Sequence, residues 1–285
     1  MEDRASVLLE ALPYIQNFHG RTLVIKLGGG LIEKEKLKNS IYQDLVLLNY
    51  VGMRPVVVHG GGSEISREME RAGKTPEFVE GLRVTDEETI EIIHKSLGGK
   101  INKEMVLGIE KYGGLALGVS GIDGNLVRAR KIESEEELGF VGEVEEINPE
   151  IVEYLIDKDY IPVIAPIGAD EEGTSLNLNA DTVAAGLASS LKAEKLILLT
   201  DVPGVLQDPE DEESLISKLS LGEAREKIEK GIITGGMIPK VKACVESVEA
   251  GANCAHIING KTSHALLLEL LTESGVGTMI EEEGS

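Results

Sequence analysis

The sequence predicts an α/β fold built on a mainly parallel central sheet. Short, continuous apolar runs recur along the chain, and segments with helical spacing of apolar residues lie between them. Runs that are apolar at every position suit strands buried on both faces, and helical crossovers are what join parallel strands. Two of these runs end in consecutive glycines, which is typical of strand ends that hold a ligand.

The first half of the chain alternates regularly between the two patterns. The helix that comes first precedes the first strand, so we expect it to be an appendage to the sheet. Between residues 125 and 146 the pattern changes to short runs around Gly139 and Gly142, which predicts a β-hairpin. Strands are predicted over 22–27, 55–59, 115–119 and 161–164, and helices over 5–17, 37–50, 63–72, 89–112, 149–158 and 181–191.

The second half restarts with a continuous apolar strand over 195–200, followed by a loop and an acidic insertion at 208–213. No long linker rich in proline or serine separates the halves, so we place a soft boundary near residue 190 and expect both halves to share one sheet. Further strands are predicted over 255–258 and 277–280, and further helices over 220–230, 238–250 and 263–272.

The charge of the chain excludes several kinds of partner. The 285 residues include 28 Lys and Arg against 50 Asp and Glu, a net charge of −22. Such a surface repels nucleic acid and anionic membranes, and no apolar stretch approaches the ~20 residues of a membrane span. We see no signal peptide at residues 1–4, and Cys244 and Cys254 fit small buried residues in a reducing compartment. We therefore expect a cytoplasmic protein.

Two glycine triplets are the clearest candidates for chemistry. Gly28 to Gly30 follow the first strand, and Gly60 to Gly62 follow the second. Consecutive glycines leave backbone N–H groups bare at the carboxyl edge of a parallel sheet, where they can bind anionic oxygens. Lys26 lies within the first apolar run, so its ammonium group is aimed at the same place. This combination predicts an enzyme that handles phosphate.

Two common nucleotide motifs are incomplete. Gly73 and Gly260 each open a Gly-Lys-Thr tripeptide, but Glu68 and Ala255 occupy the positions where a Walker loop needs its first glycine. Neither glycine triplet is followed by the third glycine of the dinucleotide fingerprint. Any phosphate is therefore bound by another scheme.

Other residues have both a structural and a functional interpretation. His59 could be a general base, but a histidine that packs the strand end and hydrogen-bonds the turn is the interpretation we favour. Arg83 is either a surface residue or a bidentate clamp for a carboxylate, and Thr85 with Glu88 would form a capping box after it. Asp181 suits a helix N-cap and could also orient Lys26.

Lys240 is the last candidate functional residue. It follows Pro239, which suits the first turn of a helix, so the lysine lies near the positive end of the helix dipole. A lysine at that end is slightly unfavourable, which indicates a functional reason for it.

Taken in order, these motifs resemble those of the amino acid kinase family over nearly the whole chain, and especially its branch that acts on N-acetyl-L-glutamate. One departure is Gly30 and the charged stretch after it. The resemblance implies a three-layer αβα sandwich in which ATP, with Mg²⁺ bridging its phosphates, donates its γ-phosphoryl group to the substrate's side-chain carboxylate. It is carried by Lys26 to Gly30, His59 to Gly62, Gly81 to Thr85, Asn177 to Asp181, Thr200 to Val205 and Gly235 to Lys240.

The resemblance also implies a role for each site residue. Lys26 and Lys240 would stabilise the charge of the transferred group, and Asp181 would organise both lysines. No general base is needed, because a carboxylate with a pKa near ~4.3 is already ionised at neutral pH. Substrate would be bound by Gly61, Gly62, Arg83 and Asn177, and nucleotide by Gly28, Gly29, Asp201, Val202, Gly204, Leu206, Ile232 and Thr234, with no direct metal ligand among them.

Three parts of the chain follow from the same resemblance: an oligomerisation helix over 1–20, an amino-acid lobe over 21–190 and a nucleotide lobe over 191–285. Arginine-inhibited members have such a helix, which joins dimers into a hexamer. The arginine site would then comprise Tyr14, Lys195, Glu269 and Gly277. The alternative is that the helix simply packs on its own subunit.

Two rival functions stay open at this point. A sibling kinase could act on carrier-linked or free N-acyl aminoadipate, or on carbamate, aspartate or a nucleotide, although a net charge of −22 disfavours an acidic carrier protein. A non-catalytic arginine sensor is a different class, and the intact Lys26, Asp181 and Lys240 argue against it.

Overall fold

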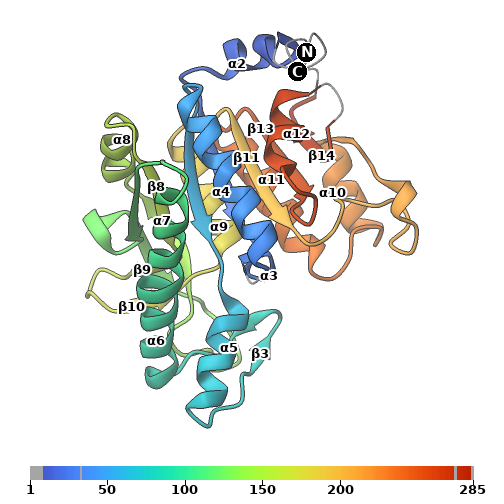
Figure 1. The fold of residues 1–285 in the computed structure, drawn as a ribbon. Helices are drawn as coiled ribbons and strands as arrows, with labels where there is room; N and C mark the ends of the chain where they lie inside the picture. The colour runs from blue at the N-terminus through green and yellow to red at the C-terminus, as the bar shows by residue number, and fades with distance from the viewer. Residues whose placement is uncertain (1–8, 33, 273–274, 284–285) are drawn as a thin grey trace.

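The computed structural model describes residues 9–32, 34–272 and 275–283. Its main sheet has eight strands in the order β12-β14-β13-β11-β1-β2-β8-β5 within this part of the chain (Figure 1). Every neighbouring pair is parallel except β13 and β14, so the prediction of one mainly parallel sheet shared by both halves is confirmed. The strands are β1 (Thr22–Leu27), β2 (Arg54–His59), β5 (Ala116–Ser120), β8 (Ile161–Ala165), β11 (Lys195–Thr200), β12 (Lys218–Ser220), β13 (Cys254–Asn259) and β14 (Gly277–Glu281).

The helices also follow the predicted order. The helix expected over 89–112 differs, because its middle is a π-helix in which Gly98 and Gly99 leave the backbone free to widen. The first four residues of the helix expected over 5–17 lie outside the described residues. The helices are α2 (Leu12–Phe18), α3 (Gly29–Ile32), α4 (Glu35–Tyr50), α5 (Gly62–Arg71), α6 (Glu87–Ile93), η1 (His94–Ile101), α7 (Asn102–Glu110), η2 (Asp123–Asn125), α8 (Glu150–Ile156), α9 (Ala180–Ser190), η3 (Glu212–Ser214), α10 (Leu221–Glu229), α11 (Met237–Glu249) and α12 (Ala265–Leu271).

Several short strands add to this plan. The predicted hairpin is confirmed as β6 (Val127–Lys131) and β7 (Gly142–Ile147). It belongs to a four-stranded sheet with β9 (Ile167–Ala169) and β10 (Ser175–Asn177), and β3 (Phe78–Val79) pairs with β4 (Leu82–Arg83). These added strands were not predicted, because two or three residues are too few to show a period of two.

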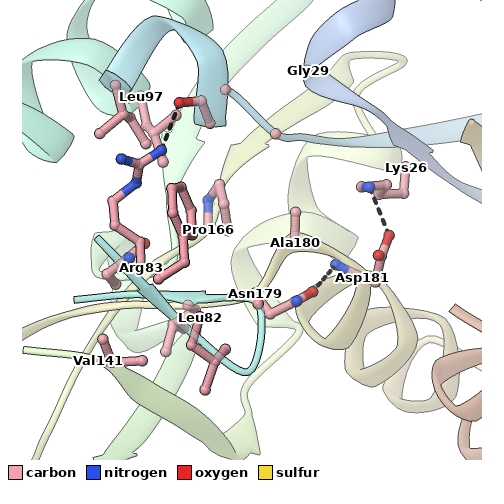
Figure 2. Close-up of a pocket in the computed structure, with 18 residues that line it drawn as sticks. Lys26, Gly29, Leu82, Arg83, Leu97, Val141, Pro166, Asn179, Ala180 and Asp181 are labelled. Carbon is pink, nitrogen blue, oxygen red and sulfur yellow. Dashed lines mark hydrogen bonds and ion pairs between the residues drawn. The ribbon is translucent and has the colours of Figure 1, made fainter. Parts of the chain in front are cut away.

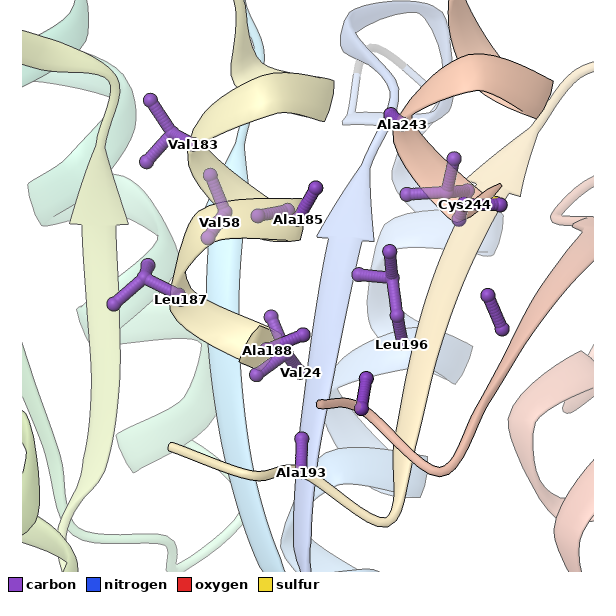
Figure 3. Close-up of a cluster of buried hydrophobic side chains, with 14 of the residues drawn as sticks. Val24, Val58, Val183, Ala185, Leu187, Ala188, Ala193, Leu196, Ala243 and Cys244 are labelled. Carbon is purple, nitrogen blue, oxygen red and sulfur yellow. The ribbon is translucent and has the colours of Figure 1, made fainter. Parts of the chain in front are cut away.

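Side-chain alternation along the sheet explains the three layers. In β1, Leu23 and Ile25 face one core with α4, α7 and α12, whereas Val24 faces the other core with α9 and α11. Figure 3 shows Val24, Val58 and Leu196 of the sheet packed under α9 and α11. Because side chains alternate, Lys26 lies on the same face as Val24 and is therefore aimed at α9.

Two predicted helix caps are wrong. The N-cap of α6 is Asp86, whose carboxylate accepts a hydrogen bond from the Thr89 N–H at 2.8 Å. Thr85 is buried and donates instead to the Arg83 carbonyl. The N-cap of α9 is Asn179, which accepts from the N–H of Asp181 at 2.7 Å. Since the N-cap lies two residues before the expected one, the Asp181 carboxylate is left for other partners.

The state of the cysteines and the length of the helices complete the description of the fold. Cys244 and Cys254 are both free and buried, as predicted. Among the described residues, no helix is both long and apolar enough to cross a membrane.

Candidate active site

One carboxylate joins two lysines at the carboxyl edge of the sheet. The Nζ atom of Lys26, in β1, lies 2.7 Å from Oδ1 of Asp181, and the Nζ atom of Lys240, in the first turn of α11, lies 2.9 Å from Oδ2. Lys26 is 8% exposed and Asp181 is 5% exposed, so the pair is nearly dry. Residues from both halves of the chain thus meet at a single point.

The charges of this cluster are coupled. Burial lowers the pKa of Lys26, and the nearby Lys240 lowers it further against the opposing effect of Asp181. Burial alone would raise the pKa of Asp181, but the two lysines outweigh it and lower that pKa, so the carboxylate is ionised at neutral pH. Two cationic side chains therefore share one anion, and the cluster suits an additional anionic ligand.

The two glycine turns face each other beside Lys26. A Cβ atom added to Gly29 would lie 3.4 Å from the backbone nitrogens of both Gly61 and Gly62, and one added to Gly60 would lie 3.4 Å from the nitrogen of Gly29. The backbones of the two turns are therefore in close proximity. The N–H of Gly28 differs from expectation, because it donates to the Leu199 carbonyl at 3.1 Å and is not available to an anion in this structure.

A cavity of about 260 Å³ lies in front of these groups. Lys26, Gly29 and Asp181 line one side, and Arg83 lines the opposite side (Figure 2). Of the residues predicted from sequence, Gly61, Gly62 and Asn177 also line it. Lys240 reaches the cluster through Asp181 and is not part of the lining.

Arg83 is a buried cation without a carboxylate partner among the described residues. Its Nη2 atom donates to the Gly62 carbonyl at 2.7 Å and to the Ser66 hydroxyl at 2.9 Å, and its guanidinium lies 4.6 Å from the centre of the Phe78 ring. The interpretation as a surface residue is wrong, since Arg83 is only 7% exposed. A buried guanidinium held only by neutral groups points to an anionic ligand.

Three other polar residues belong to the surroundings of the cavity. Asn177 lies at the end of β10, and its Nδ2 atom donates to the Thr85 hydroxyl at 3.2 Å. Asn179 lines the cavity and was missed as a site residue, although an asparagine at a helix start is a recognisable N-cap signal. Ser66, on α5, was also missed, and nothing in its sequence context distinguishes it.

His59 does not line the cavity, and the structural interpretation of this residue is confirmed. It is fully buried, and its Nδ1 atom lies 3.0 Å from the Gly60 carbonyl oxygen in the turn. Burial lowers the pKa of His59 to about 4, so the ring is neutral near pH 7.

Of the residues expected to bind nucleotide, Gly29 lines the cavity and the others do not. Asp201 and Val202 directly follow β11, which is the neighbour of β1 in the sheet, and both are exposed. Gly204 has a φ of 153°, and a Cβ there would lie 2.7 Å from Oγ1 of Thr278. Leu206 bridges to Leu215, and Ile232 and Thr234 precede α11. These positions therefore lie in the segments that follow β11, the neighbour of β1, and that precede α11, the helix of Lys240.

Two of the four residues expected to bind arginine, Lys195 and Glu269, both contact His256. The sequence analysis did not single out this histidine. The Nζ atom of Lys195 lies 2.9 Å from Nε2 of His256, and Oε1 of Glu269 lies 2.5 Å from Nδ1 of the same ring. Gly277 pairs with Ile258 of the same strand as His256. Tyr14, on α2, is half-buried against the core that α12 also contacts.

The described residues contain no group of three or more His, Cys, Asp or Glu side chains arranged to hold a metal ion. Both oxygens of Asp181 contact lysines, so this carboxylate does not suit a cation. A Mg²⁺ ion brought in on nucleotide phosphates is compatible with such a site, since Mg²⁺ in phosphoryl-transfer sites keeps few protein ligands.

Comparison with known proteins identifies relatives over nearly the full length. Acetylglutamate kinase from Syntrophomonas wolfei is 52% identical over 281 residues, covering 99% of this chain and 98% of the relative. Acetylglutamate kinase from Methanocaldococcus jannaschii is 53% identical over 293 residues, covering 99% and 98%.

Solved structures of N-acetylglutamate synthase from Neisseria gonorrhoeae share the fold. The complex with coenzyme A and N-acetyl-glutamate has a TM-score of 0.87 and covers 99% of this chain, and the complex with coenzyme A and L-arginine has a TM-score of 0.82 and covers 98%. Both are 29% identical, and this chain spans only 64% and 65% of their length. The model of the amino acid kinase family matches residues 21–259. The chain therefore belongs to the amino acid kinase family.

Proposed function

We propose that this protein is an acetylglutamate kinase, which transfers the γ-phosphoryl group of ATP to the side-chain carboxylate of N-acetyl-L-glutamate. The products are N-acetyl-L-glutamyl 5-phosphate and ADP, and the reaction serves arginine biosynthesis. Relatives of that name share about half of the residues over nearly the whole chain. The structural observation that carries the proposal is a buried guanidinium that contacts no carboxylate of the described residues, in the same cavity as Lys26 and Asp181.

The chemistry follows from the charges around the cavity. Two anions, a carboxylate and a triphosphate, must approach each other, so catalysis consists of positioning and charge neutralisation. Lys26 and Lys240 stabilise the charge of the phosphoryl group in flight, and Asp181 holds both ammonium groups. The N–H groups of Gly29, Gly61 and Gly62 bind its oxygens, while Arg83 and Asn177 orient the amino-acid substrate. Mg²⁺, when bound with ATP, neutralises phosphate charge.

A substrate panel tests this proposal. We expect ADP release, followed with a coupled assay, to be fast with N-acetyl-L-glutamate and slow with glutamate, aspartate and N-acetyl-aminoadipate. Trapping the product as a hydroxamate separates true acyl-phosphate formation from ATP hydrolysis. A preference for the longer N-acetyl-aminoadipate would instead identify a sibling kinase, and turnover with none of them would favour an arginine sensor.

Arg83→Ala is expected to raise the KM for N-acetylglutamate by about 10- to 100-fold, because hydrogen bonds to a charged group contribute about 1.5–3 kcal/mol. The KM for ATP should change little. Initial rates with each substrate varied in turn give both constants. Arg71→Ala, an exposed arginine on the same helix as Ser66, serves as the matched control. An equal rise in both constants would mean that Arg83 acts only through its bonds to Gly62 and Ser66.

The division of labour between lobes belongs to the same proposal. Residues 21–190 form the amino-acid lobe, which contains Lys26 and Arg83, and residues 191–285 form the nucleotide lobe, which contains Lys240. The expected nucleotide residues all lie in the second lobe apart from Gly28 and Gly29. We also place the protein in the cytoplasm, which agrees with its two free cysteines.

We further propose a homo-oligomer, with dimers joined through residues 1–20 into a hexamer that arginine inhibits. Apolar side chains on the surface support the interfaces: Leu9 and Leu12 near the N-terminus are exposed, as are Leu107 of α7 and Leu117 of the edge strand β5. Lys195 and Glu269, which both contact His256, would offer a cation and an anion to an amino-acid effector. Light scattering and arginine titration of activity, for the full chain and for a chain without residues 1–18, test this. Identical masses and arginine-blind curves would reject it.

A further inference from the structure

We propose that His59 is a positioning residue that fixes the Gly60–Gly61 peptide so that the Gly61 N–H faces the reacting phosphoryl group. The inference rests on the proposed function, since it assigns the histidine a part in that reaction. His59 itself stays outside the cavity and touches no reactant.

The hydrogen bond within the turn sets the direction of the peptide. Nδ1 of His59 lies 3.0 Å from the carbonyl oxygen of Gly60. A carbonyl oxygen can only accept, so Nδ1 carries the ring proton and donates it. In a trans peptide the C=O and the next N–H point in opposite directions, and the described residues contain no cis peptide. The N–H of Gly61 must therefore point away from His59.

Contacts on the other side of the turn agree with this direction. Gly61 lines the cavity, and its N–H has no hydrogen-bond partner among the residues that the structure describes. A Cβ added to Gly61 would meet side-chain atoms of Ile101 and Leu97 at 2.4 and 2.5 Å, so the π-helical segment η1 packs directly against the turn. A Cβ on Gly29 would lie 3.4 Å from the Gly61 nitrogen, which places that nitrogen at the mouth between the two glycine turns.

The contacts of Asn102 agree with this ring tautomer. Its Nδ2 atom lies 2.9 Å from the Val163 carbonyl, 3.2 Å from the Val119 carbonyl and 3.3 Å from Nε2 of His59. Its Oδ1 atom accepts from Nζ of Lys103 at 3.0 Å, which fixes the orientation of the amide. Nδ2 has two N–H groups and the two carbonyls are its nearer partners, so the contact with Nε2 is compatible with an unprotonated Nε2, the tautomer that the Nδ1 contact sets. One buried side chain thereby ties the ends of β8 and β5 to the histidine that ends β2.

A role as general base does not fit these contacts. Both ring nitrogens are occupied, the ring is fully buried, and its pKa is lowered to about 4, first by burial and then by the charge of Lys103. The ring is neutral over the whole range in which a kinase works. His59 can therefore orient the turn but has no proton to exchange with the substrate.

A pair of substitutions separates the two ring nitrogens. In His59→Asn the side-chain amide nitrogen can occupy the place of Nδ1, whereas in His59→Gln it reaches only the place of Nε2. We expect His59→Asn to keep kcat within about threefold of wild type and His59→Gln to lose about 100-fold, the cost of one misplaced oxyanion donor, with little change in the KM for ATP. Gly29→Ala, whose methyl would cover the Gly61 and Gly62 nitrogens, gives the reference for a blocked turn.

Two further measurements keep the test decisive. In wild-type protein, two-bond ¹⁵N–¹H correlation spectra should show His59 as the neutral Nδ1–H tautomer, and this readout needs no variant to fold. The pH profile of kcat should be the same for wild type and His59→Asn. An Nε2–H tautomer, an imidazolium near pH 7, equal losses in both variants or no loss in either would overturn the inference. Failure of the wild-type enzyme to phosphorylate N-acetylglutamate would instead reject the proposed function.

Discussion

Replacing Lys26 by methionine is expected to lower kcat by about 100- to 1,000-fold while the KM for ATP changes little. The proposed reaction concentrates negative charge on the phosphoryl group only as it moves, so a cation fixed beside it acts mainly on the transition state. Methionine fills nearly the same space without charge, and Asp181 keeps Lys240 as a partner at 2.9 Å. The free energy of unfolding should therefore stay within about 1.5 kcal/mol of wild type.

Steady-state kinetics and urea unfolding measure the two quantities separately. Lys158→Met, at an exposed position after α8, is the control for loss of a lysine in itself. Turnover near the wild-type level in Lys26→Met would remove this lysine from the mechanism. A fall in kcat accompanied by extensive unfolding would show that its ion pair is needed for the fold instead.

Replacing Asp181 by asparagine is expected to damage both stability and activity. The change keeps the shape of the side chain but leaves two lysines facing each other without their shared anion. Removing one partner of a buried ion pair costs about 3–5 kcal/mol, and we expect a loss of that size near pH 7. Turnover should fall by about 100-fold or more, because neither ammonium group is then held against the reacting phosphate.

The stability loss of Asp181→Asn should depend on pH with a definite sign. Without the carboxylate, the native pKa of Lys26 falls below its already lowered value, whereas the unfolded pKa stays near ~10.4. Between these two pKa values the unfolded chain binds one more proton than the native chain, so the free energy of unfolding rises with pH. In wild type the native pKa of Lys26 is higher than in the variant, so the deficit relative to wild type should shrink as the pH rises from the lower to the higher of these two native pKa values. The alkaline limb of kcat should move to lower pH.

Urea unfolding at several pH values checks this expectation. Asp157→Asn, at the exposed C-cap of α8, is the matched control, because its ion pair with Arg54 spans 3.8 Å and is well solvated. A deficit that stays constant or grows with pH would show that Lys26 does not bear the charge that Asp181 stabilises.

The position of Lys26 could be predicted from sequence, because a side chain on a buried strand can point only to one face of the sheet or the other. Its neighbours Val24, Ile25 and Leu27 require a buried backbone, and alternation then decides which face each side chain takes. The same alternation places Lys26 with Val24 against α9, and so close to Asp181. The other long strands of the sheet and most helices could be predicted for the same reason, because their apolar residues follow a clear pattern.

Other parts of the site depend on contacts that no local pattern encodes. The burial of Arg83 results from packing of the short hairpin of β3 and β4 against the helix α5, a contact between elements that no local sequence pattern reveals. Asn102 binds carbonyls of two strands that are distant in sequence. Glycine motifs indicate a bare backbone but not which N–H is free, and Gly28 shows the difference, since its N–H is bound within the sheet.

The contrast between a strongly acidic exterior and a lysine-lined interior has a kinetic consequence. ATP and a dicarboxylate are both anions, so a net charge of −22 slows their diffusion toward the protein instead of steering them in. Dissolved salt weakens this far-reaching repulsion, with a Debye length of about 10 Å at 0.1 M, but hardly affects short contacts inside a dry pocket. Moderate ionic strength should thus speed capture of both substrates, a trend opposite to that of enzymes whose surfaces attract their ligands.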